Sequence, residues 1–260
     1  MTAVTGPASQ LSVVLITLNA ERYLDQVLGA VRGTCAEIVV LDSGSTDRTR
    51  EIAERHGARF SVQPFLGYGP QKRRAVELAS HDWILSLDAD EVLDATATAG
   101  LRQIAFGDPA VCWRILRRNH VGGREIRYGH WSPDWCVRLF NRTRHTFSDD
   151  AVHEAIHPTG AVQTLPGSLL HYGYDDLADI IRGKYHRLKG AAYRARGRRA
   201  SSAALVLRAG LAFLRSYVLK RGFLDGQAGV AVALSASVNA VMGLAIASWD
   251  PPIKQPTGPA

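Results

Sequence analysis

Three acidic side chains follow an apolar run of strand length, and they are the residues best suited to chemistry. The run at 83–87 is followed by Asp88, Asp90 and Glu91. An apolar strand that delivers carboxylates at its carboxyl end is how an open α/β sheet builds a ligand site. Two carboxylates at positions i and i+2 can share one divalent ion, and their oxygens suit Mg²⁺ or Mn²⁺. An isolated Asp-x-Asp is more often an exposed acidic turn, so the rest of the chain must decide.

A second apolar run, residues 38–41, also ends on an acid, Asp42. The carboxyl ends of parallel strands line up on one edge of a sheet, where ligands bind. Asp42 could therefore accept hydrogen bonds from a nucleoside. The alternative is an N-cap for the helix that begins near Arg48, and both roles could hold.

A further carboxylate, Glu154, lies in a stretch that matches the His-Glu-x-x-His pattern of zinc proteases. That pattern works only on a helix, where His153 and His157 would face one metal ion. The stretch is short and has little helical periodicity, so a zinc site is the weaker interpretation. The favoured one makes Glu154 a general base in a loop beside the sheet edge, with histidines that are structural or tune it.

Cations and a histidine complete the candidates. Lys72, Arg73 and Arg74 open a predicted helix just after Gly69, and a helix N-terminus with cations favours phosphate. A solvated basic face is about as common. A predicted strand at 169–174 contains His171, which is a possible third metal ligand; an ordinary structural or exposed histidine is the alternative.

The elements that must position these residues alternate between strands and helices. We predict strands at 11–18, 38–41, 59–63 and 83–87, and helices at 21–31, 48–56 and 71–79. This order implies a parallel sheet with right-handed crossovers. Farther on we predict a helix at 93–106, strands at 111–116, 135–140 and 169–174, and a loop or hairpin at 117–133. The predicted class is α/β, a mostly parallel Rossmann-like sheet flanked by helices, without a Gly-x-Gly-x-x-Gly or P-loop phosphate motif.

Composition narrows the partners. The 260 residues carry a net charge of +7, which suggests an anionic partner: a nucleotide, a nucleic acid or an anionic lipid. The three cysteines form no Cys-x-x-Cys pair, so neither a disulfide framework nor a cysteine zinc site is indicated. Nucleic acid is disfavoured because the basic tract near the C-terminus lacks a recognition module. Residues 1–10 show no signal-peptide pattern and are predicted to be disordered.

The C-terminal third has a different composition. Residues 182–221 contain twelve Lys or Arg and no Asp or Glu, interleaved with aliphatic residues. A basic helix with an apolar face favours an anionic membrane surface, and a core-packing helix with a solvated basic face is the alternative. Residues 228–247 carry no charge and are long enough to span a bilayer, but they are rich in alanine, so we predict a buried or interfacial helix. These helices could also form a homo-oligomer, and the Pro-rich tail at 250–260 is predicted to be disordered.

These features predict two regions between the disordered ends, and the first is divided into two halves. A catalytic domain covers 11–178, with a nucleotide-binding half at 11–95 and an acceptor half at 96–178. A helical, membrane-associating or oligomerising extension covers 179–249.

Four motifs in order resemble family-2 glycosyltransferases with the GT-A fold. They are 11–19 (LSVVLITLN) with Glu21, 39–47 (VVLDSGSTD), 69–72 (GPQK) and 88–91 (DADE). Four later motifs are similar to one subgroup, which includes the lipopolysaccharide core glucosyltransferases of the WaaE/KdtX type: 131–134 (WSPD), 138–142 (RLFNR), 152–154 (VHE) and 222–226 (GFLDG).

The resemblance implies a nucleotide-sugar donor, most simply a UDP-hexose such as UDP-glucose. It assigns donor binding to Thr17, Leu18, Asn19, Glu21, Asp42, Lys72, Arg73, Asp88 and Ala89. It assigns the metal to the Asp88–Asp90 pair, with Asp90 as the direct ligand, and makes Glu154 the base. His171 stays the possible third ligand named above. Acceptor binding falls to Trp131, Asp134 and Arg138. The chain departs from the family pattern at Leu18, where a Tyr is usual, and at Arg73, where an Asn is frequent; both departures bear on donor preference.

The expected reaction is direct displacement with inversion. The metal neutralises the leaving diphosphate while a carboxylate deprotonates the acceptor hydroxyl. The acceptor would be a lipid-linked or cell-envelope glycan at the cytoplasmic face of a bacterial membrane. The alternatives are a non-catalytic nucleotide- or membrane-binding scaffold of the same fold and, less favoured, a zinc hydrolase.

Overall fold

The computed structural model describes residues 7–148, 154–182 and 186–249. Its contacts divide the chain into two compact units. Unit 1 comprises Met1–Glu125 and Pro133–Gly173, and unit 2 comprises Ile126–Ser132 and Tyr174–Ala260. The segment 126–132, which the sequence analysis counted in the catalytic domain, therefore packs with the C-terminal helices. Each unit is described by itself below.

Unit 1 is built on one mixed sheet, and its first four strands are parallel. They are β1 (Leu11–Thr17), β2 (Glu37–Asp42), β3 (Arg59–Val62) and β4 (Trp83–Asp88), in the spatial order β3-β2-β1-β4. β1 and β4 are buried along nearly their whole length, as expected for parallel strands covered on both faces. The α/β class is thus confirmed.

The second half of the sheet is antiparallel. It contains β5 (Glu91–Leu93), β6 (Cys112–Val121), β7 (Arg124–Glu125), β8 (Asp134–Asn141) and β9 (Val162–Tyr174). β8 pairs with β4 and with β6, and β9 pairs with β5. The segment 117–133, predicted as a loop or hairpin, begins as a hairpin, because β6 extends to Val121 and pairs with β7.

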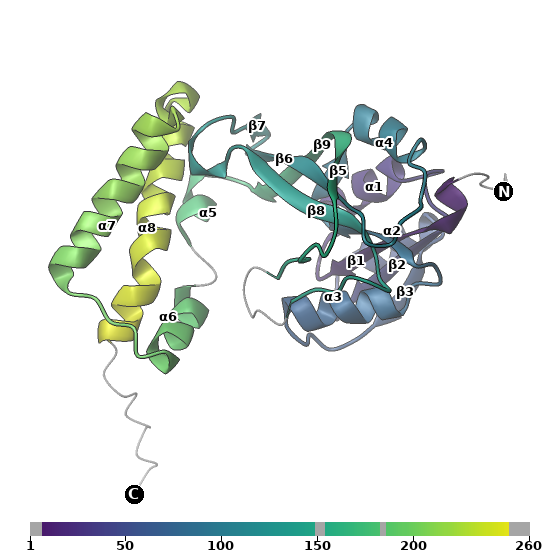
Figure 1. Cartoon of the computed structure of the whole chain (residues 1–260), viewed down its shortest axis with the longest axis horizontal. Coiled ribbons are helices and arrows are strands. Elements are labelled where there is room, and N and C mark those ends of the chain that lie inside the picture. Colours follow the sequence, from purple (N-terminus) through teal and green to yellow (C-terminus); the bar gives the residue numbers. More distant parts are fainter. Residues whose placement is uncertain (1–6, 149–153, 183–185, 250–260) are drawn as a thin grey trace, which may run out of the picture. The chain divides into compact units, whose positions relative to one another are not determined.

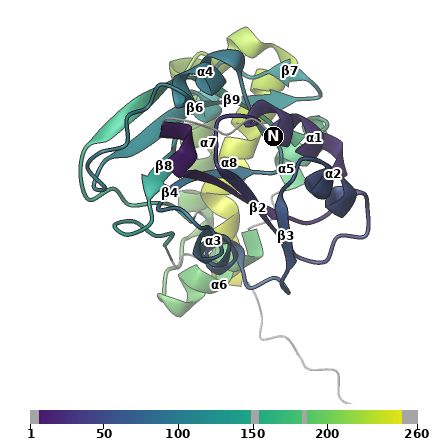
Figure 2. The ribbon, with the colours of Figure 1, turned by 90° about the vertical axis from the view of Figure 1, so that its right-hand side faces the viewer.

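Helices cover both faces of this sheet. α1 (Glu21–Ala30), α2 (Thr49–Arg55) and α4 (Ala95–Leu101) pack into one apolar core, and α3 (Tyr68–Glu77) packs into another. The alternation along β1 explains the two cores, because Val13 and Leu15 face the first and Val14 faces the second. In Figures 1 and 2, α1 and α3 lie on opposite sides of the strands.

Two predicted helix boundaries were wrong. The helix expected at 93–106 is limited to α4, because Glu91–Leu93 forms β5 and Asp94 caps α4 by accepting a hydrogen bond from the Ala97 amide at 2.8 Å. α3 begins at Tyr68 instead of residue 71. Pro70 fits its first turn, where no backbone N–H is required.

Unit 2 is helical. Its elements are α5 (Leu177–Arg182), α6 (His186–Ala195), α7 (Ser202–Leu214), a π-helical turn (Arg215–Leu219), a 3₁₀ turn (Gly222–Asp225) and α8 (Gln227–Trp249). α5, α6 and α7 all contact α8. The single basic helix predicted from residue 182 is therefore interrupted: Gly197 adopts a left-handed conformation and Ser201 caps α7.

The segment 126–132 is tied to these helices by a buried carboxylate. Asp225 accepts hydrogen bonds from the backbone amides of Arg127 and Tyr128, at 3.1 and 2.9 Å. α8 and the stretch Ser202–Leu219 are long and apolar enough to cross a membrane by length and composition alone. The core helix of a soluble protein passes the same test, and 44% of the α8 window is buried.

Candidate functional site

The carboxyl ends of three parallel strands meet at one edge of the sheet in unit 1. Thr17 on β1 is in register with Asp42 on β2, and Ile16 is in register with Asp88 on β4. The acidic strand ends therefore lie side by side, as the order of strands and helices predicted. Asp88 is the last residue of β4, and Asp90 and Glu91 follow it directly.

Asp42 organises the loop that follows its strand. Its carboxylate accepts hydrogen bonds from the hydroxyls of Thr17 (2.7 Å) and Ser45 (2.5 Å) and from the amides of Gly44 (2.8 Å) and Ser45 (2.6 Å). Burial raises the pKa of Asp42, but these hydrogen bonds outweigh burial and lower the pKa below its ordinary value. Asp42 does not cap α2: Arg48 holds the N-cap position, and the Thr49 amide that follows donates to the carboxylate of Asp47 at 3.0 Å.

The loops after β1 and β2 are joined by reciprocal hydrogen bonds. Asn19 adopts a left-handed conformation. Its side-chain oxygen accepts from the Thr46 backbone amide at 2.9 Å, and its backbone amide donates to the Ser45 hydroxyl at 2.8 Å. The carboxylate of Glu21 accepts from the Arg48 amide at 3.2 Å. The side chain of Leu18, which precedes Asn19, is 59% exposed. These predicted donor-binding residues thus form one connected edge with an apolar side chain projecting from it.

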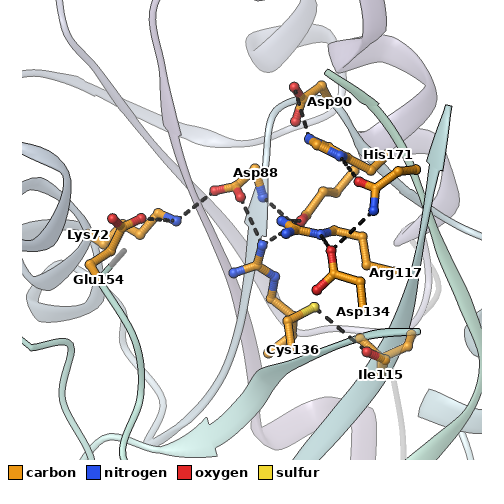
Figure 3. Close-up of polar contacts among 12 residues, drawn as sticks. Lys72, Asp88, Asp90, Ile115, Arg117, Asp134, Cys136, Glu154 and His171 are labelled. Carbon is orange, nitrogen blue, oxygen red and sulfur yellow. Dashed lines mark hydrogen bonds and ion pairs between the residues drawn. The ribbon is translucent and has the colours of Figure 1, made fainter. Parts of the chain in front are cut away.

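Asp88 lies between two cations. Its carboxylate is 2.7 Å from Lys72 Nζ and 2.8 Å from an Arg138 nitrogen, and Lys72 Nζ also lies 2.9 Å from a Glu154 oxygen (Figure 3). Burial opposes the charge of Asp88, yet Lys72 and Arg138 keep its pKa far below the ordinary value. Burial likewise lowers the pKa of Lys72, but Asp88 and Glu154 raise it above the ordinary value. The ion contacts therefore favour the charged forms of Asp88 and Lys72 despite their burial.

Glu91 forms the buried floor of this network. Its carboxylate is fully buried, pairs with Arg138 and with Arg117 (3.2 Å), and accepts a hydrogen bond from the Asp88 amide at 3.2 Å. Arg138 was predicted to contact the acceptor, but its guanidinium is buried and paired with Asp88 and Glu91. Sequence reasoning did not assign any role to Glu91 or Arg117.

Asp90 faces His171. Asp90 Oδ2 lies 3.7 Å from His171 Nε2, and the pairing of β5 with β9 sets this geometry because Glu91 is in register with His171. Burial raises the pKa of Asp90; His171 lowers it, and the negative charges of Asp88 and Glu91 raise it further. The net shift is upward, so this carboxylate lies where additional positive charge is favourable.

The described residues contain no cluster of three His, Cys, Asp or Glu side chains that could by themselves form a metal centre. Asp90 and His171 bring an oxygen and a nitrogen from neighbouring segments to within 3.7 Å of each other. The contact network around them joins five carboxylates (Asp88, Asp90, Glu91, Asp134 and Glu154) to three cations (Lys72, Arg117 and Arg138). By formal charge these carboxylates exceed these cations by two, which would suit one Mg²⁺ or Mn²⁺ with further ligands from water and phosphate.

The remaining predicted residues have these positions. Ala89 is half-buried between the two aspartates, and Arg73 donates to the backbone carbonyls of Phe147 and Ser148 at 3.0 and 3.2 Å. Trp131 belongs to unit 2 and stacks on Tyr174, with ring centroids 4.7 Å apart.

The zinc-protease pattern lacks its helix in the part of the stretch that is described. His153 lies outside the described residues. Glu154 and His157 are in extended or irregular backbone, and Ile156 between them forms an isolated bridge with Phe147. The geometry that this pattern requires is therefore not present at 154–157.

The chain resembles known proteins along most of its length. The family model for glycosyl transferase family 2 matches residues 12–163. The lipopolysaccharide core biosynthesis glycosyltransferase LpsC of Rhizobium meliloti (strain 1021) is 33% identical over 251 residues, which cover 91% of each chain. An uncharacterised glycosyltransferase of Rickettsia typhi is 26% identical over 84% of this chain and 79% of its own. Among solved structures, glucosyl-3-phosphoglycerate synthase of Mycobacterium tuberculosis, in complex with Mn²⁺, UDP and glucosyl-3-phosphoglycerate, aligns over 44% of each chain with 25% identity and a TM-score of 0.35.

Proposed function

Because the chain belongs to glycosyl transferase family 2, we propose that this enzyme moves a hexose from a UDP-sugar, such as UDP-glucose, to a hydroxyl of a lipid-linked or cell-envelope glycan. The observation that carries the proposal is the ion network at the carboxyl edge of the sheet, in which Lys72 joins Asp88 to Glu154. It supports the proposal because the carboxylate of Glu154, which would be the base, lies 2.9 Å from a lysine that also contacts Asp88.

The donor would lie along the edge formed by the ends of β1 and β2. Thr17, Asn19 and Glu21 belong to the joined loops there, and Leu18 offers an apolar surface to the nucleoside. Asp42 would act by holding this loop in shape, because its oxygens already accept four hydrogen bonds. Lys72 and Asp88 would lie near the diphosphate and sugar. Arg73 would support the neighbouring loop through Phe147 and Ser148.

Asp90 and His171 would hold a Mg²⁺ or Mn²⁺ ion together with the diphosphate of the donor. When bound, the ion neutralises charge that develops on the leaving diphosphate. Asp88 would orient the donor from its position between Lys72 and Arg138, and Arg138 would act from beneath the site as a support for Asp88.

Glu154 would accept the proton of the acceptor hydroxyl. Its contact with Lys72, whose charge burial does not remove, fits the ionised state that a base requires. The acceptor oxygen forms a bond to the anomeric carbon while the bond from that carbon to the diphosphate breaks, so the configuration inverts. A positioned carboxylate base contributes about 10²–10⁴ in rate. Trp131 would offer a stacking surface to the acceptor.

We further propose that the enzyme works on the cytoplasmic face of the cell membrane, attached peripherally through unit 2. None of the residues of α7 is buried, and Leu207, Leu211, Leu214 and Val218 are each at least half exposed at helical spacing along one side. Arg208 and Arg215 are exposed next to this apolar row. Such a surface fits an anionic bilayer, and the similarity to LpsC supports an envelope glycan as acceptor.

The test is the thermal stability of the purified protein with UDP, GDP and dTDP, each with and without Mn²⁺. A ligand that binds only the folded state stabilises it by about 2.7 kcal/mol at a hundredfold excess over its Kd. We expect a Mn²⁺-dependent shift with UDP that is lost in Asp90→Ala. A shift with another nucleotide would change the donor, and no shift with any nucleotide would refute the donor site.

A scaffold without activity is the competing function. It predicts nucleotide binding but no hydrolysis or transfer of UDP-sugar, and normal cellular function in Asp90→Ala. Metal-dependent turnover that is abolished by EDTA and by Asp90→Ala would exclude it.

A further inference from the structure

We infer that Asn119 and Asp134 are positioning residues that fix the tautomer of His171, so that Nε2 of the imidazole presents a lone pair toward Asp90. This inference rests on the proposed metal site. It gives Asp134, which the sequence assigned to the acceptor, a different task, and it adds Asn119, which no motif indicated.

The three side chains form a chain of hydrogen bonds across three strands. Asn119 on β6 lies with Oδ1 2.6 Å from His171 Nδ1 on β9, and with Nδ2 3.2 Å from Asp134 Oδ2 on β8. Figure 3 shows Asp134, His171 and Asp90 following one another along this line.

The carboxylate of Asp134 sets the direction of the whole chain. An ionised carboxylate only accepts hydrogen bonds, so the amide NH₂ of Asn119 must face Asp134 and its carbonyl oxygen must face His171. A carbonyl oxygen also only accepts, so His171 Nδ1 must carry a proton. In the neutral imidazole this leaves Nε2 as the acceptor nitrogen, and Nε2 is the atom 3.7 Å from Asp90 Oδ2.

Asp134 is itself fixed. Arg117 Nε lies 2.9 Å from Asp134 Oδ2, and another nitrogen of Arg117 lies 3.2 Å from the buried Glu91. Asp134 is therefore held in one orientation next to a cation, and its oxygen is placed to accept from the amide of Asn119.

The tautomer decides what can lie between His171 and Asp90. With the proton on Nδ1, Nε2 and the carboxylate are two electron-pair donors that face each other, and a cation between them is favourable. With the proton on Nε2, the imidazole would donate to Asp90 and both ligands would be occupied by one hydrogen bond. Groups that orient a ligand histidine in this way typically change metal affinity by about 10–100-fold when they are removed.

The first measurement is the tautomer itself, in protein with ¹⁵N-labelled histidine. His171→Gln assigns the imidazole signals by their loss. In the wild type we expect the shifts of an Nδ1–H tautomer for His171. In Asn119→Leu, which removes the carbonyl acceptor, we expect a shift toward the Nε2–H form. A spectrum of His171 that is unchanged in Asn119→Leu would overturn the inference.

The second measurement is Mn²⁺ binding in the presence of UDP, followed by electron paramagnetic resonance. We expect Asn119→Leu to weaken Mn²⁺ binding by about 10–100-fold. The matched control is Asn141→Leu, because Asn141 is another buried asparagine on β8, and its side chain bonds only to Thr143 among the contacts given for it. The control should lose stability without changing the His171 signal or Mn²⁺ affinity.

A second variant keeps the test valid even if Asn119→Leu does not fold. Asp134→Leu removes the carboxylate that accepts from the Asn119 amide, so the constraint that Asp134 places on the orientation of Asn119 is lost, and we expect the Nε2–H form of His171 to gain population and Mn²⁺ binding to weaken. An unchanged His171 spectrum in Asp134→Leu would count against the inference. If the wild type binds no Mn²⁺ with UDP, both the metal site and this inference fail; if it binds Mn²⁺ and Asn119→Leu binds it equally well, only the inference fails.

Discussion

The two units use cationic side chains in opposite ways. In unit 1, Lys72, Arg117 and Arg138 are largely withdrawn from solvent, and each lies within 3.2 Å of carboxylates from other segments. In unit 2, Arg208 on α7 and Arg215 at the start of the π-helical turn are exposed, and the tract from 182 to 221 offers no acidic residue as a partner.

This difference separates charge that fixes geometry from charge that attracts a surface. Burying an ion costs several kcal/mol, so the buried cations persist only because their carboxylate partners are held in place, and the reverse is also true. The exposed cations fix nothing locally, but their fields add and attract an anionic surface. Substitutions of these cations in the two units should therefore show their effects in different assays.

The largest effect should come from Asp90→Asn. The substitution removes a ligand charge from the site with the two-charge excess, so we expect UDP-sugar turnover to fall by at least about 10³-fold, the scale of several kcal/mol of lost transition-state stabilisation. Turnover is measured by nucleotide release with and without Mn²⁺. The control is Asp25, which forms an exposed ion pair with Arg55 on the surface of unit 1. Asp25→Asn should keep wild-type turnover. Equal loss in both variants would contradict the assignment.

Next in size is Arg138→Met. Methionine fills the space but leaves Glu91 fully buried without its closest cation, and breaking a buried pair from one side costs about 3–5 kcal/mol. Urea unfolding at pH 7 measures the loss. The double variant Arg138→Met with Glu91→Gln should recover part of the stability, because it removes the unpaired charge. A loss of under about 1 kcal/mol in the single variant would show that the pair is not buried as described.

Much of the site's edge could be predicted because it follows from strand order. Apolar runs ending on Asp42 and Asp88, joined by helical segments, are enough to place both residues at one edge of a parallel sheet. The hydrogen-bond partners of Asp42 could not be predicted, since they depend on how two loops fold back on one another.

The floor of the site was missed because its residues lie in the antiparallel half of the sheet, where the order of pairing is not local. A signal existed: Asp134, Cys136 and Arg138 alternate along one strand, as Arg117 and Asn119 do along its partner. In β8 these residues alternate with Trp135, Val137 and Leu139, a pattern that indicates one polar face. Their pairing partners could not be read from the sequence, because a one-residue change of register would reverse the face.

A half-buried histidine, His130, extends the comparison to unit 2. Burial, with a smaller contribution from Lys220, lowers the pKa of His130 to about 4. A histidine with a pKa below its unfolded value stabilises the fold above pH 6.5, and this stability is lost as pH falls from 6.5 toward 4, because the unfolded chain binds the proton more readily. After allowance for partial exposure, we expect a loss of about 1–2 kcal/mol between pH 7 and 5 that is absent in His130→Gln. Urea unfolding at the two pH values measures the difference; identical pH dependence in both proteins would refute it.

The smallest effect concerns the exposed cations. Arg208→Gln and Arg215→Gln should each weaken binding to vesicles that contain anionic lipid by about 1 kcal/mol, or roughly fivefold, and should leave binding to neutral vesicles and UDP-sugar turnover in solution unchanged. Arg32→Gln and Arg102→Gln, at exposed positions in unit 1, each remove the same single charge and are the matched controls. If the controls weaken vesicle binding equally, net charge alone attracts the protein to the membrane. If only Arg208→Gln and Arg215→Gln weaken vesicle binding, the attraction is local to the apolar row of Leu207, Leu211, Leu214 and Val218. Leu211→Ser should then weaken binding to anionic vesicles at high salt, because screening has removed most of the contribution of the arginines under that condition.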